Sequence, residues 1–271
     1  MSEQLSYTAS GCGIIQVGMT SSFAVLGSPI GHSKSPALHR AAFVTAGIDA
    51  TYEAIELGSG LAGFVSSLGE EWHGLSLTMP LKEQALDVAQ QLHPLAISTR
   101  SANTLIRVSD SWLGYNTDVM GLRAAVSQVG FESVGILGNG ATARSACVAF
   151  EDDRVSVWAR NSDRAVALSE AFGATVESLE EVLSKDLVIS TLPAGALKPL
   201  LEGQYSGVLL DVAYANTDTH TNFSGFISGL EMLLWQAVGQ QRLFRTGQLD
   251  TELENEPEVV SAMRSALVVE E

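Results

Sequence analysis

Short apolar runs alternate along the chain with segments whose apolar residues recur at helical spacing. Turn residues such as glycine, proline and serine separate the runs. Because strands that alternate with helices build βαβ units, the pattern predicts an α/β fold with an open, largely parallel sheet. In the first half we expect strands from residue 23 and over 51–57, 72–80 and 102–108, a short strand and turn over 111–118, and helices over 36–46, 60–69 and 82–92.

A second series of strands and helices follows, with its own glycine turn, and it predicts a domain boundary near Asp118. We therefore expect two domains. Residues 1–118, completed by 229–271, form a substrate and catalytic domain, and residues 119–228 form a Rossmann-like nucleotide-binding domain. In the second half we expect an amphipathic segment over 120–131, a strand, turn and helix over 133–151, strands over 154–161, 186–193 and 207–214, helices over 162–173 and 229–247, and a helix within 249–267.

The first 22 residues lack the basic start and apolar core of a signal peptide, so we expect a loose tail over 1–22. Met19 directly precedes the first strand and is an alternative start to Met1. A real, ordered extension is the competing interpretation.

Composition and charge narrow the classes of function. Of 271 residues, 46% are apolar and 17% are charged, which is typical of globular proteins. The formal net charge of −16 repels nucleic acids and anionic membrane surfaces, and no apolar run approaches the roughly 18 residues that span a bilayer. Cys12 and Cys147 are far apart, which argues against a disulfide and favours the cytoplasm. We expect a small-molecule substrate, no nucleic acid, no membrane and no metal.

A glycine-rich turn joins an apolar strand to an alanine-rich helix. Gly138, Gly140 and Ala143 form the G-x-G-x-x-A pattern of dinucleotide-binding folds. The first glycine permits the tight turn, the second lets a pyrophosphate approach the backbone, and the small third residue lets helix and strand pack closely. A turn that binds no ligand is the competing interpretation. The cofactor-binding residues expected here are Gly138, Asn139, Gly140, Ala141, Thr142 and Ala143.

The end of the next strand distinguishes NADP from NAD. NAD-binding folds carry an acidic residue there, about 20 residues beyond the glycines, for the ribose 2′-hydroxyl. This chain has Arg160, followed by Arg164 at the start of a helix. Guanidinium groups suit a 2′-phosphate and can stack on adenine, so the sequence predicts NADP. A solvated arginine pair near Asp163 is the alternative.

One lysine closely follows the apolar run of residues 72–80. Lys82 is expected near the carboxyl end of a strand, where open α/β sheets form their binding crevices. A lysine that is partly desolvated in a cleft can transfer protons when a carboxylate lies beside it. Asp118 is the best candidate because it ends the last strand region before the second domain. Such a pair can relay the proton of a secondary alcohol while a nicotinamide carries its hydride. Two surface charges are the alternative.

Six motifs together resemble those of the shikimate dehydrogenase family. They occur in that family's order and approximate spacing from about Phe23 to Gly247. The motifs are GSPIGHSKSPALH, LTMPLKE, ANTL, GYNTDVMG, GNGATA and GLEMLLWQA. The resemblance implies a cytoplasmic, NADP-dependent oxidoreductase that reduces 3-dehydroshikimate to shikimate on the route to chorismate and the aromatic amino acids.

The resemblance also implies roles for single residues. Lys82 and Asp118 match the catalytic pair, and Tyr214 matches a tyrosine at the mouth of the substrate site. Neutral hydroxyl and amide groups suit a polyhydroxylated ring acid because they both donate and accept hydrogen bonds. The residues that match the substrate-binding set are Ser33 and Ser35 for the carboxylate and Thr78, Asn103 and Gln236 for the ring hydroxyls.

Some positions depart from the family pattern. Ser76 stands where the family usually has Asn, which weakens the contacts expected around Thr78, and Asn161 replaces the Thr that usually follows the NADP arginine. Two alternatives therefore stay open: a quinate and shikimate dehydrogenase that uses NAD, and a non-catalytic nucleotide-binding relative. The sequence also leaves open the choice between a monomer and a homodimer.

Overall fold

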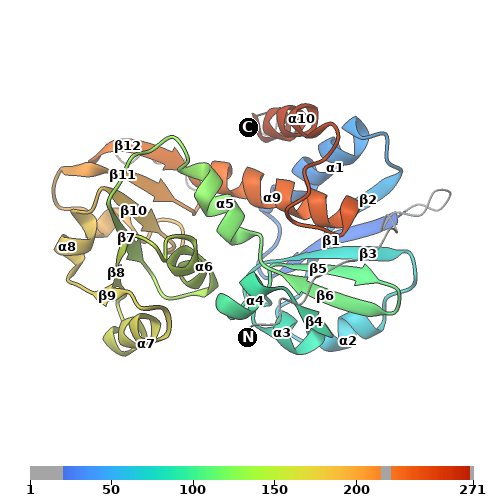
Figure 1. The fold of residues 1–271 in the computed structure, drawn as a ribbon, viewed down its shortest axis with the longest axis horizontal. Helices are drawn as coiled ribbons and strands as arrows, with labels where there is room; N and C mark the ends of the chain where they lie inside the picture. The colour runs from blue at the N-terminus through green and yellow to red at the C-terminus, as the bar shows by residue number, and fades with distance from the viewer. Residues whose placement is uncertain (1–20, 215–220, 269–271) are drawn as a thin grey trace, which may run out of the picture.

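The computed structural model describes residues 21–214 and 221–268. Figure 1 shows two α/β units side by side, with α5 (Asp118–Ala125) and α9 (Gly229–Thr246) where they meet. Each unit is built around a sheet of six strands. This architecture confirms the α/β fold class that the sequence predicts.

The first sheet combines parallel and antiparallel strands. Its strands are β1 (Ser21–Gly27), β2 (Ala50–Glu56), β3 (Trp72–Leu77), β4 (Gln91–Leu92), β5 (Thr104–Val108) and β6 (Ser111–Tyr115). The order is β2–β1–β3–β5–β6–β4, and β1 pairs in parallel with β2 and β3. The β3–β5 and β5–β6 pairs are antiparallel, which the sequence did not predict. The chain between β5 and β6 is only a tight turn at Ser109, which has a φ of 54°, and such a turn can join only antiparallel strands.

Helices cover both faces of this sheet. Successive side chains of a strand point to opposite faces, and those of β1 are apolar on both, so each face has to be shielded from water. Phe23 and Val25 pack on one face with Phe244 of α9, and Ala24 and Leu26 pack on the other. The helices of this unit, besides α9, are α1 (Ser35–Thr45), α2 (Leu61–Ser66), α3 (Gln84–Val88), α4 (Pro94–Ser98) and α10 (Glu256–Val268).

The second sheet is parallel at every pairing. Its strands are β7 (Ser133–Leu137), β8 (Arg154–Trp158), β9 (Thr175–Val176), β10 (Leu187–Ser190), β11 (Tyr205–Asp211) and β12 (Phe223–Ser228). The order β12–β11–β10–β7–β8–β9 is the Rossmann order, and its direction reverses between β7 and β10. The helices of this unit are α6 (Ala141–Ala149), α7 (Ser162–Phe172), α8 (Leu179–Leu183) and the short 3-10 helix η1 (Lys198–Leu200).

Helix α9 returns the chain to the first sheet. Ser228 caps its start by accepting from the Leu230 amide, and Gly247 ends it with a φ of 72°. Arg242 of α9 donates to both carboxylate oxygens of Glu256, at 2.6 and 2.8 Å, and so ties α10 to this unit. Across the two described ranges, no helix combines the length and apolar character needed to cross a membrane.

Several expected elements differ in extent or were missed. Strand β1 begins at Ser21, so the expected tail over 1–22 overlaps it, while residues 1–20, with Met1, Cys12 and Met19, lie outside the described ranges. The helix expected over 82–92 ends at Val88 because the chain then pairs with β6 as β4. The sequence did not predict β4, α4, β9, α8, η1 or β12, most of which are too short to show a clear hydrophobic period.

Candidate active site

A cavity of about 350 Å³ lies where loops of the two units meet. Loops after β1 and β3 line one side, at the point where the strand order of the first sheet reverses. Open α/β sheets form their binding crevices at such points. Residues of α6 and of the segment after β11 line the other side. The structure brings the predicted catalytic and substrate-binding residues together around this cavity: Ser33, Ser35, Thr78, Lys82, Asn103, Asp118, Tyr214 and Gln236.

Lys82 and Asp118 form an ion pair in the cavity. Nζ of Lys82 donates to Oδ2 of Asp118 across 2.6 Å, and the two side chains are 13% and 3% exposed. Lys82 lies in the turn between β3 and α3, and Asp118 is the first residue of α5. Within the described part of the chain this is the only hydrogen bond of the ammonium group. Because an ammonium group has three donors, two of them are left for a ligand.

Three features hold the Asp118 carboxylate in place. Its Oδ1 accepts from Nδ2 of Asn103 at 2.8 Å, so each carboxylate oxygen has a partner. Its backbone amide donates to Oδ1 of Asn116 at 2.9 Å, which fixes the first turn of α5. The helix N-terminus also favours a negative charge at this position. The carboxylate is therefore oriented before any ligand arrives.

Asn103 links this pair to α9. Its Nδ2 lies 2.9 Å from Oγ1 of Thr117 and 3.2 Å from Oε1 of Gln236, in addition to its contact with Asp118. Three acceptors thus share two hydrogens. Gln236 donates one hydrogen to the carbonyl of Leu233 and keeps the other for a ligand. Two of the predicted ring-binding residues therefore belong to one network with the catalytic pair.

Glu56 fixes the loop that carries the two predicted carboxylate-binding serines. Its carboxylate accepts from the Ser28 hydroxyl at 2.5 Å and from the Ile30 amide at 2.9 Å. These hydrogen bonds lower the pKa of Glu56, and burial opposes them only slightly. Farther along the loop, the Ser35 amide donates to Oγ of Ser33 at 3.3 Å. The loop is anchored at its start, and both serines line the cavity.

Tyr214 approaches the cavity from the second unit. It follows β11, and its phenol hydrogen-bonds to the backbone of Lys34, which directly precedes α1 in the first unit. Burial raises the pKa of the Tyr214 phenol, and this hydrogen bond opposes the rise in part. Tyr214 therefore stays a neutral hydrogen-bonding group and links the two units at the cavity.

The glycine loop fits a dinucleotide pyrophosphate. Gly138 has a φ of 120°, and a Cβ there would lie 2.2 Å from Oγ1 of Thr191, so only glycine suits the turn between β7 and α6. Among residues 21–214 and 221–268, a Cβ built on Gly140 would meet no heavy atom within 4 Å, and no side chain caps α6. The start of α6 therefore offers uncapped amide groups beside an open position, and phosphate oxygens are favoured at such helix starts. Ala143 is fully buried, as the close packing of helix and strand requires.

Arg160 and Arg164 lie beside this loop. Strand β8 pairs in parallel with β7, so Arg160 shares a sheet edge with Gly138. Both arginines are exposed, and among the described residues neither guanidinium has an ion pair, with Asp163 or with any other carboxylate. Asn161 accepts from the Arg164 amide at 3.0 Å and so caps α7. Two unpaired guanidinium groups at this edge fit a 2′-phosphate.

Comparison with known proteins identifies the family. Residues 25–105 match the family model described as the shikimate dehydrogenase substrate binding domain. Shikimate dehydrogenase (NADP(+)) of Thermus thermophilus is 32% identical over 245 residues, which cover 84% of this chain and 93% of that protein. The chain belongs to the shikimate dehydrogenase family. The protein of the same name from Hyphomonas neptunium is 34% identical over 242 residues. These residues cover 81% of this chain and 90% of the Hyphomonas protein.

Solved structures of the shikimate dehydrogenase family share the fold. Mycobacterium tuberculosis shikimate dehydrogenase gives a TM-score of 0.79 at 33% identity, covering 92% of this chain and 99% of that one. Shikimate 5-dehydrogenase of Thermus thermophilus, solved with NADP(H) and shikimate, gives a TM-score of 0.77 at 29% identity. The match covers 91% of this chain and 100% of that one. The similarity extends over both α/β units, as the six sequence motifs predict.

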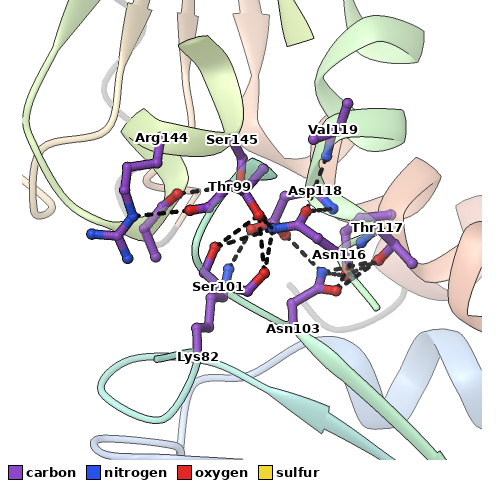
Figure 2. Close-up of polar contacts among 12 residues, drawn as sticks. Lys82, Thr99, Ser101, Asn103, Asn116, Thr117, Asp118, Val119, Arg144 and Ser145 are labelled. Atoms are coloured by element: carbon purple, nitrogen blue, oxygen red, sulfur yellow. Dashed lines mark hydrogen bonds and ion pairs between the residues drawn. The ribbon is translucent and has the colours of Figure 1, made fainter. Parts of the chain in front are cut away.

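Sequence reasoning missed Asn116, which supports Asp118. Asn116 is fully buried, and its Oδ1 accepts from the amides of Asp118 and Val119 at 2.9 and 3.4 Å. A signal was present in the motif GYNTD, because asparagine two residues before a helix start commonly bonds to the backbone ahead of it. Figure 2 labels Asn116 and draws its hydrogen bonds as dashed lines.

A buried chain of hydrogen bonds beneath the cavity was missed as well. The Tyr52 hydroxyl donates to Oγ of Ser76 at 2.6 Å, and Ser76 donates to Oε1 of Gln240 at 2.9 Å. Gln240 also lies 3.0 Å from Nε2 of His39 and donates to the carbonyl of Asn103 at 3.2 Å. Burial lowers the pKa of His39 to about 3, although the contact with Gln240 opposes this. Ser76, the departure from the family pattern, thus has a defined partner in Tyr52.

Proposed function

We propose that this protein is an NADP-dependent shikimate dehydrogenase, which interconverts 3-dehydroshikimate and shikimate. The observation that carries the proposal is the Lys82–Asp118 ion pair at 2.6 Å. The pair lies in a cavity between the glycine loop and the loop that carries Ser33 and Ser35, called the serine loop below. The named relatives and the complex of a related enzyme with shikimate and NADP(H) support it. Aromatic amino acid biosynthesis follows from the family.

Lys82 acts as the proton-transfer group. In reduction, its ammonium donates a proton to the ketone oxygen, which becomes the hydroxyl of the product. In oxidation, the neutral amine accepts that proton back from the hydroxyl. Asp118 orients Lys82 through the 2.6 Å contact, and Asn103 orients Asp118. These contacts are made among protein groups alone, so the ligand has to bring only its own oxygen to Nζ.

The substrate is held by neutral groups. Ser33 and Ser35 bind the carboxylate, and Thr78, Asn103 and Gln236 bind the ring hydroxyls. Hydroxyl and amide groups suit this task because a buried polar group left without its partner penalises analogues that lack the matching hydroxyl. Tyr214 closes the site from the second unit, and all these side chains line one cavity.

The cofactor belongs at the carboxyl edge of the second sheet. When bound, the nicotinamide supplies or removes a hydride at the carbon that bears the reacting oxygen. The loop from Gly138 to Ala143 would hold the pyrophosphate, and Arg160 and Arg164 would hold the 2′-phosphate. The open position at Gly140 and the two guanidinium groups, neither of which has an ion pair within the described ranges, support this assignment.

The domain assignment is part of the proposal. Residues 1–118 with 229–271 bind the substrate, and residues 119–228 bind NADP. The distribution of strands supports it, since β1–β6 form one sheet and β7–β12 the other, and α9 packs on the first.

Initial rates with each substrate and each cofactor test the proposal. The purified protein is assayed with shikimate or quinate, each with NADP or NAD at matched concentrations. We expect turnover with shikimate and NADP to exceed every other combination. Faster turnover with quinate or with NAD would favour the alternative dehydrogenase, and binding without turnover would favour a non-catalytic relative.

A further inference from the structure

Arg144 connects the helix of the glycine loop to the turn that carries Lys82, and Figure 2 shows its contact with Thr99. Its Nη2 donates to Oε1 of Glu83 at 2.6 Å, and Glu83 directly follows Lys82. Its Nε donates to the carbonyl of Thr99 at 3.1 Å, and Nη2 reaches the carbonyl of Arg100 at 3.4 Å. The Arg144 side chain is only 16% exposed, whereas its partner Glu83 is 65% exposed. One guanidinium on α6 thus contacts two segments of the first unit, one at Glu83 and one at Thr99 and Arg100.

The segment that Arg144 contacts at Thr99 and Arg100 is also connected to Asp118, through Asn116. Nδ2 of Asn116 lies 2.9 Å from Oγ1 of Thr99 and 3.1 Å from the carbonyl of Ser101. It also lies 3.1 Å from Oγ of Ser145, the neighbour of Arg144 on α6. The other end of the Asn116 amide accepts from the Asp118 backbone. Helix α6 is therefore connected to both members of the catalytic pair, by Arg144 on one side and Ser145 on the other.

The backbone of Arg100 gives independent support. Arg100 has a φ of 49°, in the left-handed region that disfavours residues with a Cβ. Its guanidinium lies over the ring of Phe172 in α7, 5.7 Å from the ring centroid. Residues held in this region persist only where the surroundings fix them, and they cluster at functional sites. Here the surroundings are α6 and α7 of the second unit.

We propose that Arg144 is a positioning residue that fixes the cofactor-binding end of α6 relative to Lys82 and Asp118. Transfer between two bound reactants depends on their separation, and a shift of about 1 Å can cost about 100-fold in rate. Arginine suits this role because its planar fork can bond to a carboxylate and to backbone carbonyls at the same time. The inference rests on the proposed function, since the positioned groups are the proton donor and the cofactor helix.

Steady-state kinetics on the full chain test the inference. The variants are Arg144→Met, Arg144→Lys and, as a matched control, Arg154→Met, which removes a guanidinium from the exposed Arg154–Glu132 pair. We expect Arg144→Met to lower kcat by about 10- to 100-fold while each KM changes by less than about threefold. Arg144→Lys should restore part of kcat, and Arg154→Met should match the wild type. A fall in kcat that tracks loss of thermal stability, or an unchanged kcat, would overturn the inference.

Hydrogen–deuterium exchange without ligands gives a readout that does not depend on activity. In Arg144→Met we expect faster exchange at residues 82–84, 99–101 and 116–119, and no change there in Arg154→Met. Unchanged exchange would contradict the positioning role. If the wild type turned over none of the substrates, the proposed function would fail while this measurement would still decide whether Arg144 orders these segments.

A second variant covers the case in which Arg144→Met does not fold. Glu83 is 65% exposed, so Glu83→Gln removes the charge partner with little effect on packing. We expect it to lower kcat by about 3- to 10-fold at an unchanged melting temperature, as befits the loss of one charge-assisted contact. A kcat equal to that of the wild type would remove the Arg144–Glu83 pair from the proposal.

Discussion

Lys82 and Asp118 meet at 2.6 Å although they are separated by 36 residues and belong to different elements. The turn after β3 supplies the ammonium, and the first residue of α5 supplies the carboxylate. Asn103 holds the second carboxylate oxygen at 2.8 Å, so the pair is oriented by protein groups alone. The proposed proton transfer therefore needs no rearrangement of these three side chains.

Removing the Lys82 ammonium should abolish most turnover and leave binding largely intact. We expect Lys82→Met to lower kcat by about 100- to 10,000-fold, the usual contribution of a general acid or base. Shikimate affinity, measured by calorimetry, should fall by less than about tenfold, because the serine loop and Gln236 still hold the ligand. Lys198→Met, at an exposed position in η1, is the matched control and should keep wild-type rates. A Lys82→Met protein with full turnover would remove Lys82 from the mechanism.

Arg160 should determine the preference for NADP over NAD. We expect Arg160→Ala to weaken NADP binding by about tenfold or more, because a charge-assisted contact with a phosphate is lost. NAD binding should stay within about twofold, since NAD lacks the 2′-phosphate. Fluorescence titration of both reduced cofactors measures this. Arg154→Ala, at the opposite end of β8, is the control, and equal losses for both cofactors would contradict the assignment.

The buried contact between Tyr52 and Ser76 should show strong coupling. Ser76→Ala leaves the Tyr52 hydroxyl unpaired in a fully buried site, and we expect a loss of about 1–3 kcal/mol in the free energy of unfolding. Tyr52→Phe removes that hydroxyl, so the double variant should be less destabilised than the sum of the two single changes. Urea denaturation of the four proteins measures the coupling. Additive losses would show that the two hydroxyls do not depend on each other.

Most of the longer strands and the contact between Lys82 and Asp118 were predictable because each leaves a local signal. Residues 72–77 form a largely apolar run broken by His73 and Ser76, and Lys82 and Asp118 lie in motifs with a chemical meaning. The antiparallel β5–β6 hairpin was not predicted, since the turn at Ser109 contains no glycine to mark it. Arg144 was missed for another reason. Its partners lie on distant segments, and a sequence pattern along one element carries no trace of contacts made across the two units.

His39 should make stability depend on pH. Its folded pKa is about 3 because of burial, below the ordinary value of 6.5. As the pH falls below 6.5, the unfolded chain therefore binds a proton before the folded chain does, and stability is lost progressively toward pH 3. From pH 7 to pH 5 this amounts to about 2 kcal/mol.

Urea denaturation at pH 7 and pH 5 checks this prediction. We expect His39→Gln to be less stable than the wild type at pH 7, because it loses the stacking on Tyr52, and to lose less further stability on acidification. His32→Gln, at an exposed histidine, is the matched control and should follow the wild type. The same loss of stability in His39→Gln and in the wild type would contradict the proposed cause.

The most direct test of the central claim is the initial rate at which the purified chain forms NADPH from shikimate and NADP. We predict steady turnover by the wild-type protein, and a rate at least about 100-fold lower for Lys82→Met at the same protein concentration. No NADPH formation by the wild type at any pH from about 6 to 10 would contradict the account.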